Sequence, residues 1–231
     1  MVIENYKKIR EAIDEVCAGC GRDKNDVLLL AVSKTKPLSD IEELITIGVK
    51  DFGENKVQEL VKKKEEVSAP VNFHLIGHLQ TNKVKQAVGN ACLIHSVDSF
   101  HLAEKIEQEA AKKDITVDIL IEVNVADEES KFGLMVEDTP ALVEQIAENC
   151  PHIRIKGLMT IAPFVEDPEE NRPVFRTLRQ LALDIKSKKI DNVTMGVLSM
   201  GMTNDYKVAI EEGATIVRVG TAIFGERNYN I

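Results

Sequence analysis

The sequence predicts an α/β fold, a single (β/α)8 barrel of the TIM type with an extra N-terminal helix. Eight short apolar runs, typical of strands buried in a parallel sheet, alternate with segments of helical periodicity. Eight such units with short connections are the number that closes a parallel sheet into a barrel. The length of 231 residues is normal for one barrel, so we expect one domain over residues 1–231.

Each expected element follows from a local pattern. Apolar runs predict strands at residues 28–32, 49–53, 71–76, 92–97, 117–125, 153–159, 193–198 and 214–219. Apolar residues three or four apart predict helices at residues 4–18, 39–47, 57–69, 82–88, 99–113, 139–146, 168–188 and 205–212. Ser39 and Glu42 form a capping-box pattern, and Thr139 before Pro140 is another expected helix start.

A doubly wound open sheet is the alternative architecture. Such a sheet usually carries a glycine-rich turn after its first strand. Here that turn reads Ser-Lys-Thr-Lys-Pro over residues 33–37 and contains no glycine, which favours the barrel.

Composition excludes several classes of protein. With a net charge of −9 and no concentrated basic face, nucleic-acid binding is not expected. No apolar stretch approaches the roughly 20 residues that span a bilayer, and the N-terminus lacks a secretory h-region, so we expect a cytoplasmic protein. Of the four cysteines, Cys17 and Cys20 form a C-x-x-C pattern, but no second ligand pair follows them. We interpret that pattern as the end of the first helix.

Lys34 lies where the first apolar run, Leu28 to Val32, ends. A buried, unpaired ammonium group costs several kcal/mol or loses its proton, so a lysine at this point of a core strand is notable. By itself, Lys34 is more simply explained as the solvated start of a loop.

Small and hydroxyl-bearing residues follow the last two expected strands. Ser199 and Gly201 come after the seventh, and Gly220 and Thr221 come after the eighth. In barrels of this kind, these two loops commonly form a phosphate site from converging backbone N–H groups. Arg218 precedes the second loop and needs an acceptor, because a guanidinium stays charged.

A lysine, a phosphate site and an arginine at one end of a barrel fit a particular ligand chemistry. A desolvated lysine forms a Schiff base with an aldehyde. An aldehyde that carries a phosphate and a flat heteroaromatic ring is pyridoxal 5′-phosphate (PLP). No set of residues with metal-ligand spacing is apparent: His74 and His78 are four apart, but on a strand this spacing does not make them converge.

Seven sequence blocks in the same order resemble the pyridoxal phosphate homeostasis protein family over essentially the whole chain. They are LLAVSKTKP at 29–37, FGENKVQE at 52–59, FHLIGHLQTNK at 73–83, IHSVDS at 94–99, KGLMTI at 156–161, LSMGMTND at 198–205 and VRVGTAIFG at 217–225. The resemblance implies a monomeric barrel similar to the N-terminal domain of alanine racemase.

The resemblance also implies the roles of individual residues toward PLP. The Schiff-base (aldimine) lysine falls on Lys34, and the pyridine nitrogen falls against Arg218. The phosphate falls on Ser199, Gly220 and Thr221, with Gly201 in the same loop, and Asn55 and Met159 line the ring. Where the family commonly has serine after the second methionine of its strand-seven loop, this chain has Thr203, which keeps the hydroxyl.

Efficient catalysis is not expected. Fold-III racemases use a second base, a tyrosine from an extra β domain, and only about ten residues follow the last expected strand here. An arginine at the pyridine nitrogen also weakens the ring as an electron sink. We expect a PLP carrier that buffers the cofactor or delivers it to apo-enzymes through transient contacts. The alternatives are a weak racemase-like PLP enzyme that uses Lys34 alone and a class I aldolase-like barrel without PLP.

Overall fold

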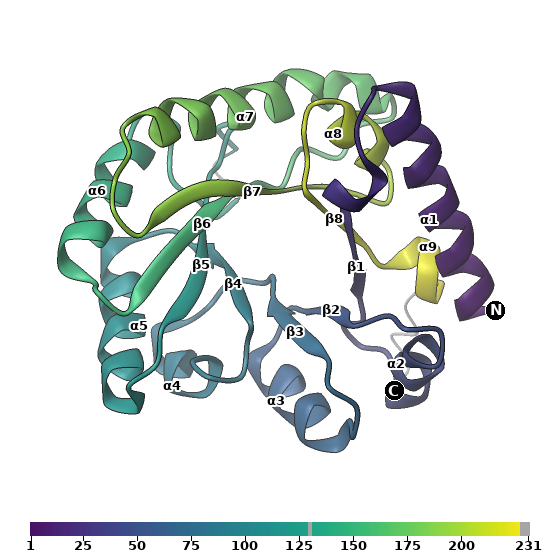
Figure 1. Ribbon diagram of the computed structural model, residues 1–231, viewed down its shortest axis with the longest axis horizontal. Helices are drawn as coiled ribbons and strands as arrows, with labels where there is room; N and C mark the ends of the chain where they lie inside the picture. The colour runs from purple at the N-terminus through teal and green to yellow at the C-terminus, as the bar shows by residue number, and fades with distance from the viewer. Residues whose placement is uncertain (129–130, 227–231) are drawn as a thin grey trace.

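The strands of the computed structural model, which describes residues 1–128 and 131–226, pair in chain order and close on themselves because β8 pairs with β1. Figure 1 looks into the ring that the strands form. The strands are β1 (Leu28–Val32), β2 (Asp51–Glu54), β3 (Asn72–Leu75), β4 (Leu93–Val97), β5 (Val117–Glu122), β6 (Ile153–Met159), β7 (Val193–Met202) and β8 (Ile216–Val219). The predicted closed parallel barrel is therefore confirmed.

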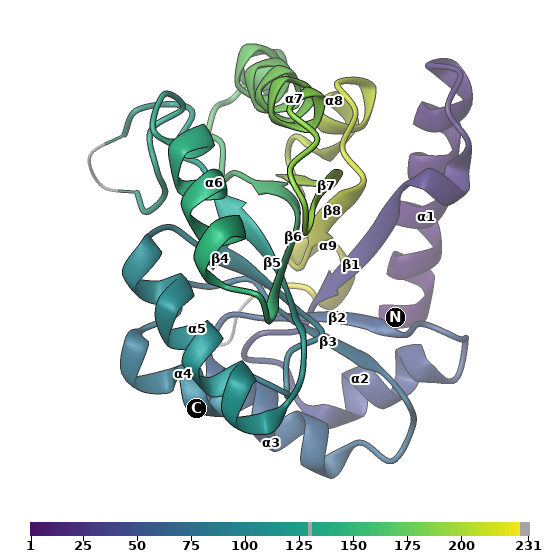
Figure 2. The same cartoon turned by 60° about the vertical axis from the view of Figure 1, so that its left-hand side comes forward.

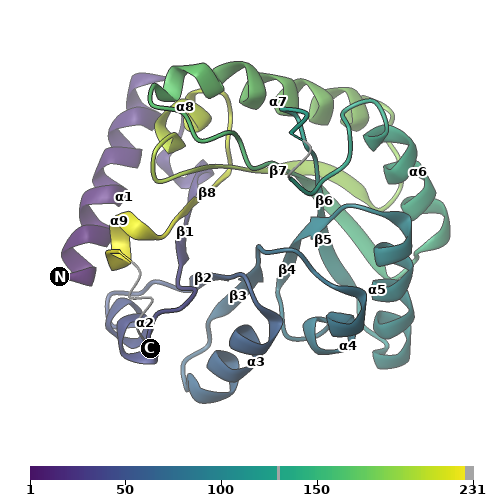
Figure 3. The same ribbon diagram turned by 180° about the vertical axis from the view of Figure 1, so that it is seen from behind.

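Helices follow the strands and cover the outside of the barrel. They are α1 (Val2–Gly19), α2 (Leu38–Ile45), α3 (Val57–Glu66), α4 (Val84–Ala87), α5 (Phe100–Lys113), α6 (Thr139–Asn149), α7 (Arg172–Ser187), α8 (Tyr206–Glu211) and α9 (Thr221–Phe224). From the side, α3, α4 and α5 lie on one flank of the barrel, and α7 and α8 lie on another (Figure 2). From behind, the predicted extra helix α1 lies beside α9, outside β1 and β8 (Figure 3).

The core has an outer and an inner part, because alternate residues of a strand point to opposite faces. On β1, Leu29 and Ala31 pack outward against the helices, whereas Leu30 points into the barrel. The inner apolar cluster comprises Leu30, Val32, Ile76, Leu93, Leu120, Met159 and Ile216. This cluster fills part of the barrel, and polar side chains occupy another part.

The ends of the helices were predicted less accurately than the types of the elements. The N-cap of α2 is Pro37 without a side-chain cap, so the expected Ser39 capping box is wrong. Thr139 is inside α6, whose N-cap is Asp138, and its hydroxyl donates to the Met135 carbonyl. Strand β7 extends beyond the predicted end, and the short helix α9 was not predicted.

None of the helices in the described part of the chain is long and apolar enough to cross a membrane.

Candidate functional site

The closure of the barrel brings two of the predicted site segments together. Ala31 on β1 pairs with Val219 on β8, so the turn after β1 lies beside the start of α9. A Cβ on Gly220 would lie 3.2 Å from the carbonyl oxygen of Val32, which shows how closely the two segments approach. We call this end of the barrel, where the strands terminate, the mouth.

Lys36 ties the two segments together by hydrogen bonds. Its Nζ donates to the carbonyl oxygens of Phe224, Gly225 and Glu226, at 2.9, 3.1 and 2.9 Å. These carbonyls lie at the C-terminal end of α9, where the helix dipole favours a cation. Lys36 therefore fixes α9 to the turn that carries Lys34.

Lys34 is half-buried in the turn after β1, at the mouth. The next residue, Thr35, has a φ of 63°, in the left-handed region that a threonine seldom adopts. Such a conformation persists where the surrounding structure holds it.

A buried ion-pair cluster behind the mouth holds this turn. We call Glu54, Glu59 and Lys63 the turn clamp. Ser33 Oγ donates to Glu54 Oε1 at 2.5 Å, and Lys63 Nζ donates to the Ser33 carbonyl at 2.7 Å. The Thr35 amide donates to Glu59 Oε1 at 2.6 Å, and Lys63 pairs with both carboxylates at 2.8 and 2.7 Å. The clamp thus fixes the backbone on both sides of Lys34.

Arg218 is buried inside the barrel, because it shares the inward face of β8 with Ile216. Its Nη1 donates to Ser199 Oγ at 2.7 Å, and its Nη2 donates to the Thr160 carbonyl at 2.8 Å. Burial lowers the pKa of Arg218 to about 10, against the opposing effect of nearby carboxylates. The guanidinium therefore stays charged at neutral pH, held in place by two of its own donors.

The two predicted residues of the β7 loop have different surroundings. Ser199 is fully buried, and its hydroxyl contacts Arg218 and, at 3.0 Å, His95 Nδ1. Gly201 has a φ of 90°, and a Cβ there would lie 2.5 Å from the Cβ of Ala209. Gly201 thus lies near the end of β7, where the pairing with β8 shifts register, and it lets β7 pack closely against α8.

Thr203 and Thr221 are exposed, one at the end of each phosphate-loop candidate. Met202 pairs with Arg218, so Thr203, the next residue, follows β7 at the level of Val219, just before the segment that starts α9. Gly220 is the N-cap of α9, and the first amides of a helix have no acceptor within the helix. The two loops therefore place hydroxyl groups and helix-start amides at the same part of the mouth.

The two residues predicted to line the ring lie at different depths. Asn55 is half-buried directly after β2, at the mouth. Met159 is 1% exposed and belongs to the inner apolar cluster, paired in register with Ser199. Met159 thus forms part of the apolar floor below the mouth, whereas Asn55 lies at its rim.

The sequence prediction missed two buried polar residues of the barrel interior, His95 and Glu122. It also missed the contact that buried His74 makes there. His74 Nδ1 lies 3.0 Å from His95 Nε2, whereas His78 stacks on the ring of Phe132 with centroids 3.9 Å apart. The alternation of β4 carries a signal for His95, because it shares a face with Leu93.

Glu122 faces the interior near Arg218. Burial raises the pKa of Glu122 to about 7, repulsion from Asp98 adds to this effect, and Arg218 opposes it. A carboxyl group next to the candidate site therefore titrates near neutral pH. In residues 1–128 and 131–226, no group of three or more His, Cys, Asp or Glu side chains is arranged to hold a metal ion.

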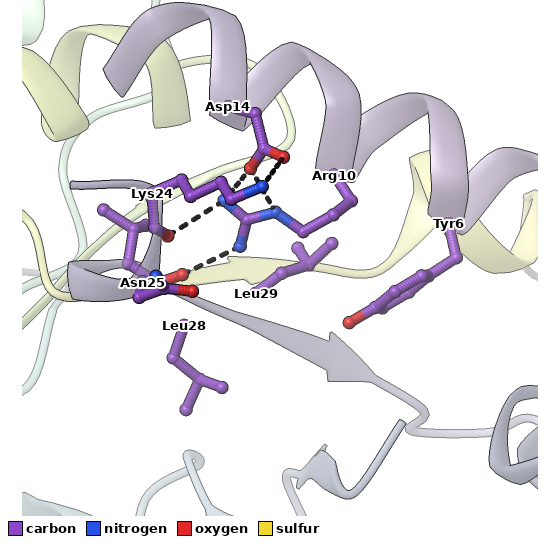
Figure 4. A pocket seen from close by; sticks show the side chains of 8 residues that line it. Tyr6, Arg10, Asp14, Lys24, Asn25, Leu28 and Leu29 are labelled. Atoms are coloured by element: carbon purple, nitrogen blue, oxygen red, sulfur yellow. Dashed lines mark hydrogen bonds and ion pairs between the residues drawn. The ribbon is translucent and has the colours of Figure 1, made fainter. Parts of the chain in front are cut away.

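A separate pocket of about 400 Å³ lies at the other end of β1, between this strand and α1 (Figure 4). Arg10 crosses it, pairs with Asp14 at 2.6 Å and donates to the Val27 carbonyl at 2.8 Å. Two cavities of about 220 Å³ lie at the mouth end, one lined in part by Asn55 and His78. The pocket in Figure 4 is therefore distinct from the candidate site.

Known proteins match nearly the whole chain. Residues 5–228 match the family model described as alanine racemase, N-terminal domain. A relative from Aquifex aeolicus, named pyridoxal phosphate homeostasis protein, is 47% identical over 227 residues and 98% of each chain. The chain belongs to the pyridoxal phosphate homeostasis protein family. The resemblance drawn from the seven sequence blocks is thus confirmed.

Two solved structures agree with this family membership. A protein of unknown function from Bifidobacterium adolescentis is 37% identical, with a TM-score of 0.87, over 96% of this chain and 94% of its own. PipY of Synechococcus elongatus, solved with PLP bound, is 34% identical, with a TM-score of 0.80, over 92% of this chain and 100% of its own. The predicted barrel of the alanine racemase N-terminal type is confirmed.

Proposed function

We propose that this protein binds PLP at the mouth of the barrel and serves intracellular PLP homeostasis, buffering the cofactor or delivering it to apo-enzymes. The observation that carries the proposal is the convergence of Lys34, Arg218 and the Gly220–Thr221 segment at one mouth. This convergence occurs in a chain related to PipY, whose structure was solved with PLP bound.

The residues present fit the parts of PLP. PLP supplies an aldehyde that condenses reversibly with a lysine amine, and Lys34 is the lysine we propose for that bond. Gly220 and Thr221 offer the start of α9 to a phosphate, and the close approach of Gly220 to Val32 leaves little room for a side chain there. Arg218, held by Ser199 and Thr160, is the residue that we assign to the pyridine nitrogen.

The hydroxyl contacts to the phosphate come from two loops in this proposal. Ser199 was predicted as a direct phosphate ligand, but its hydroxyl already contacts Arg218 and His95. We assign Ser199 to the support of Arg218, and Thr203 and Thr221 to the phosphate. Asn55 at the rim and Met159 in the floor remain the residues proposed to border the ring.

A carrier role fits the chemistry of Arg218 better than catalysis does. A guanidinium with a pKa of about 10 does not give its proton to a pyridine nitrogen at neutral pH. The nitrogen then stays unprotonated, and the ring is a weaker electron sink. We therefore propose that the protein is a carrier. We also propose that it is cytoplasmic and monomeric and that it makes transient contact with PLP-dependent apo-enzymes.

Borohydride reduction tests the attachment. PLP is added to the wild type, Lys34→Ala and Lys36→Ala, and the reduced adduct is located by mass spectrometry. We expect the adduct on Lys34 in the wild type and in Lys36→Ala, and its loss in Lys34→Ala. An adduct that persists in Lys34→Ala would show that the site is assigned to the wrong lysine. Transfer of PLP to an apo-enzyme in the presence of a trap for free PLP then tests delivery.

A weak racemase-like activity is the second candidate, favoured by the match to the alanine racemase N-terminal domain. A second base is hard to place among the tyrosines. Tyr6 lines the pocket at the other end of β1, Tyr206 is buried at the start of α8, and Tyr229 lies outside the described residues. Exchange of the α-hydrogen of alanine with deuterated solvent is the test, and its absence would exclude this candidate.

A further inference from the structure

The barrel interior contains a continuous row of polar contacts, of which the proposed function uses only the Arg218–Ser199 end. Asp51 Oδ1 lies 3.3 Å from His74 Nε2, and His74 Nδ1 lies 3.0 Å from His95 Nε2. His95 Nδ1 lies 3.0 Å from Ser199 Oγ, which accepts from Arg218 Nη1 at 2.7 Å. We call these five residues the interior chain. It runs from the first residue of β2 to the candidate site.

The arginine end of the interior chain has a fixed direction. A guanidinium has only donors, so Ser199 Oγ accepts from Arg218. The remaining side-chain contact of this hydroxyl within the described residues is with His95 Nδ1. If Ser199 donates its proton there, Nδ1 of His95 is the bare, accepting nitrogen.

The aspartate end is compatible with the same direction. Burial by itself would raise the pKa of Asp51, but its hydrogen bonds with His74 and Asn72 hold that pKa below the usual value. Asp51 is therefore ionised and can only accept, so Nε2 of His74 carries a proton. If the His74 ring carries only this proton, its Nδ1 accepts from His95 Nε2.

The two directions meet consistently in the middle. With both imidazoles neutral and protonated on Nε2, every hydrogen bond points from Arg218 toward Asp51, and each contact has one donor and one acceptor. A proton added to His74 Nδ1 would reverse the tautomer of His95. Ser199 would then accept from two neighbours, and its own proton would lack a partner in the chain. Hydrogen bonds that all point one way also strengthen one another.

The charges around the interior chain agree with this assignment. Burial lowers the pKa of His95 well below its usual value, and a positive charge on His74 or Arg218 acts in the same direction. Glu122 and Asp205 are the carboxylates that act on Arg218, and Lys50 and Asn72 act on Asp51. The neutral ring of His95 therefore lies between the cationic Arg218 and the anionic Asp51 ends of the chain.

We propose that His74 and His95 are positioning residues, which orient Arg218 through a one-way hydrogen-bond chain of fixed tautomers anchored at Asp51. His95 acts on Arg218 through Ser199, and His74 sets the tautomer of His95. The consequence for the cofactor rests on the proposed function: the guanidinium that faces the pyridine nitrogen is fixed before PLP binds.

The first test is NMR on the protein without PLP. Histidine and arginine side chains are labelled with 15N, and long-range 1H–15N spectra are recorded at neutral pH, with exposed His101 as an internal reference. We expect His74 and His95 each to show a protonated Nε2 and a bare Nδ1. A His95 protonated on Nδ1, or an imidazolium at either position, would overturn the proposal.

Three variants separate positioning from packing. His95→Gln keeps one donor and one acceptor, and His95→Leu keeps neither. Leu93→Ala, on the same strand and in the inner apolar cluster, removes packing but none of the side-chain hydrogen bonds of the chain. We expect the Arg218 side-chain N–H signals to exchange with water about tenfold faster in His95→Leu, which loses the contact to Ser199, and to stay protected in the other two. Equal exchange in His95→Leu and Leu93→Ala would mean that His95 only fills space.

The same variants are then titrated with PLP. We expect about tenfold weaker binding in His95→Leu, matching the loss of one buried hydrogen bond, and near wild-type binding in His95→Gln. If the tautomers are as assigned and the wild type does not bind PLP, the proposed function fails and the interior chain stands. If the tautomers differ, the interior chain fails whatever the binding result.

Discussion

The Lys34 turn shows how much of a binding site depends on residues that never touch the ligand. Its left-handed Thr35 is held by the turn clamp, and the clamp is itself a buried ion-pair network. Burial raises the pKa of Glu54, and the neighbouring Lys63 opposes that effect. Removing the lysine from such a network leaves buried carboxylates without compensation.

We predict that Lys63→Met lowers the free energy of unfolding by about 3–5 kcal/mol, since it breaks a buried ion pair. Lys62→Met is the matched control, because the Lys62 side chain is 74% exposed and its pair with Glu66 spans 3.9 Å. That pair contributes at most about 1 kcal/mol. Urea unfolding followed by circular dichroism gives both values, and equal losses in the two variants would contradict the role of the clamp.

We predict that Glu122→Gln flattens the pH dependence of stability. The folded-state pKa of about 7 lies above the usual value of 4.5, so folding takes up a proton. The resulting stabilisation is complete below pH 4.5 and is lost as the pH rises through about 7. The loss amounts to roughly 3 kcal/mol at most, at about 1.4 kcal/mol per pKa unit.

Urea unfolding between about pH 5 and pH 8 measures this difference, because the linkage slope follows the proton count. Glu144→Gln is the control, since that side chain is 47% exposed and pairs with Lys188 at the surface. A Glu122→Gln profile with the same slope as the wild type would argue against a carboxyl that titrates near pH 7.

At the scale of elements, the end of β7 and the segment after β8 depend on glycines for different reasons. Gly201 combines a positive φ with close packing against α8, whereas Gly220 allows close approach to β1. Lys36 then joins the end of α9 to the turn after β1. The mouth is thus built from turns that are fixed to one another.

We predict that Gly201→Ala lowers the free energy of unfolding by about 1–3 kcal/mol, because the new Cβ overpacks against Ala209. The variant should also weaken PLP binding, since the β7 loop must shift. Gly196→Ala on the same strand is the control, because a Cβ there meets nothing within 4 Å. If both variants bind PLP and unfold alike, the backbone conformation at Gly201 does not position the site.

For the whole molecule, closure of the sheet makes the stability of each strand depend on its packing against the others. The inner apolar cluster takes members from β1, β4, β5, β6 and β8, so each strand packs against side chains of distant ones. The hydrogen-bonded seam between β8 and β1 joins the two ends of the sequence.

We predict that Leu30→Ala, at a fully buried inner position, lowers the free energy of unfolding by about 2–5 kcal/mol. Because the cluster is shared, amides of β4 and β5 should lose as much hydrogen-exchange protection as those of β1. Leu183→Ala on α7 is the control, since Leu183 is 49% exposed. Loss of protection confined to β1 would show that the barrel does not unfold as one unit.

Sequence periodicity determined the strand and helix types, and the glycine-free turn after the first strand separated the barrel from an open sheet. Sequence blocks also determined the family and Lys34 as the candidate attachment residue. These features depend on local patterns of two to seven residues, which a single chain displays directly. The helix ends at Ser39 and Thr139 were predicted less well, because packing of the preceding loop decides where a helix begins.

Only the tertiary structure decided which polar residues meet. Ser199 was expected at the phosphate, but the inward face of β7 places its hydroxyl between Arg218 and His95. His74 meets His95 rather than any residue near it in sequence, since β3 and β4 are neighbours in the barrel. The physical reason is that strand alternation determines whether a side chain points into or out of the barrel. Which residue that side chain then contacts across the barrel depends on strand register and on closure of the sheet.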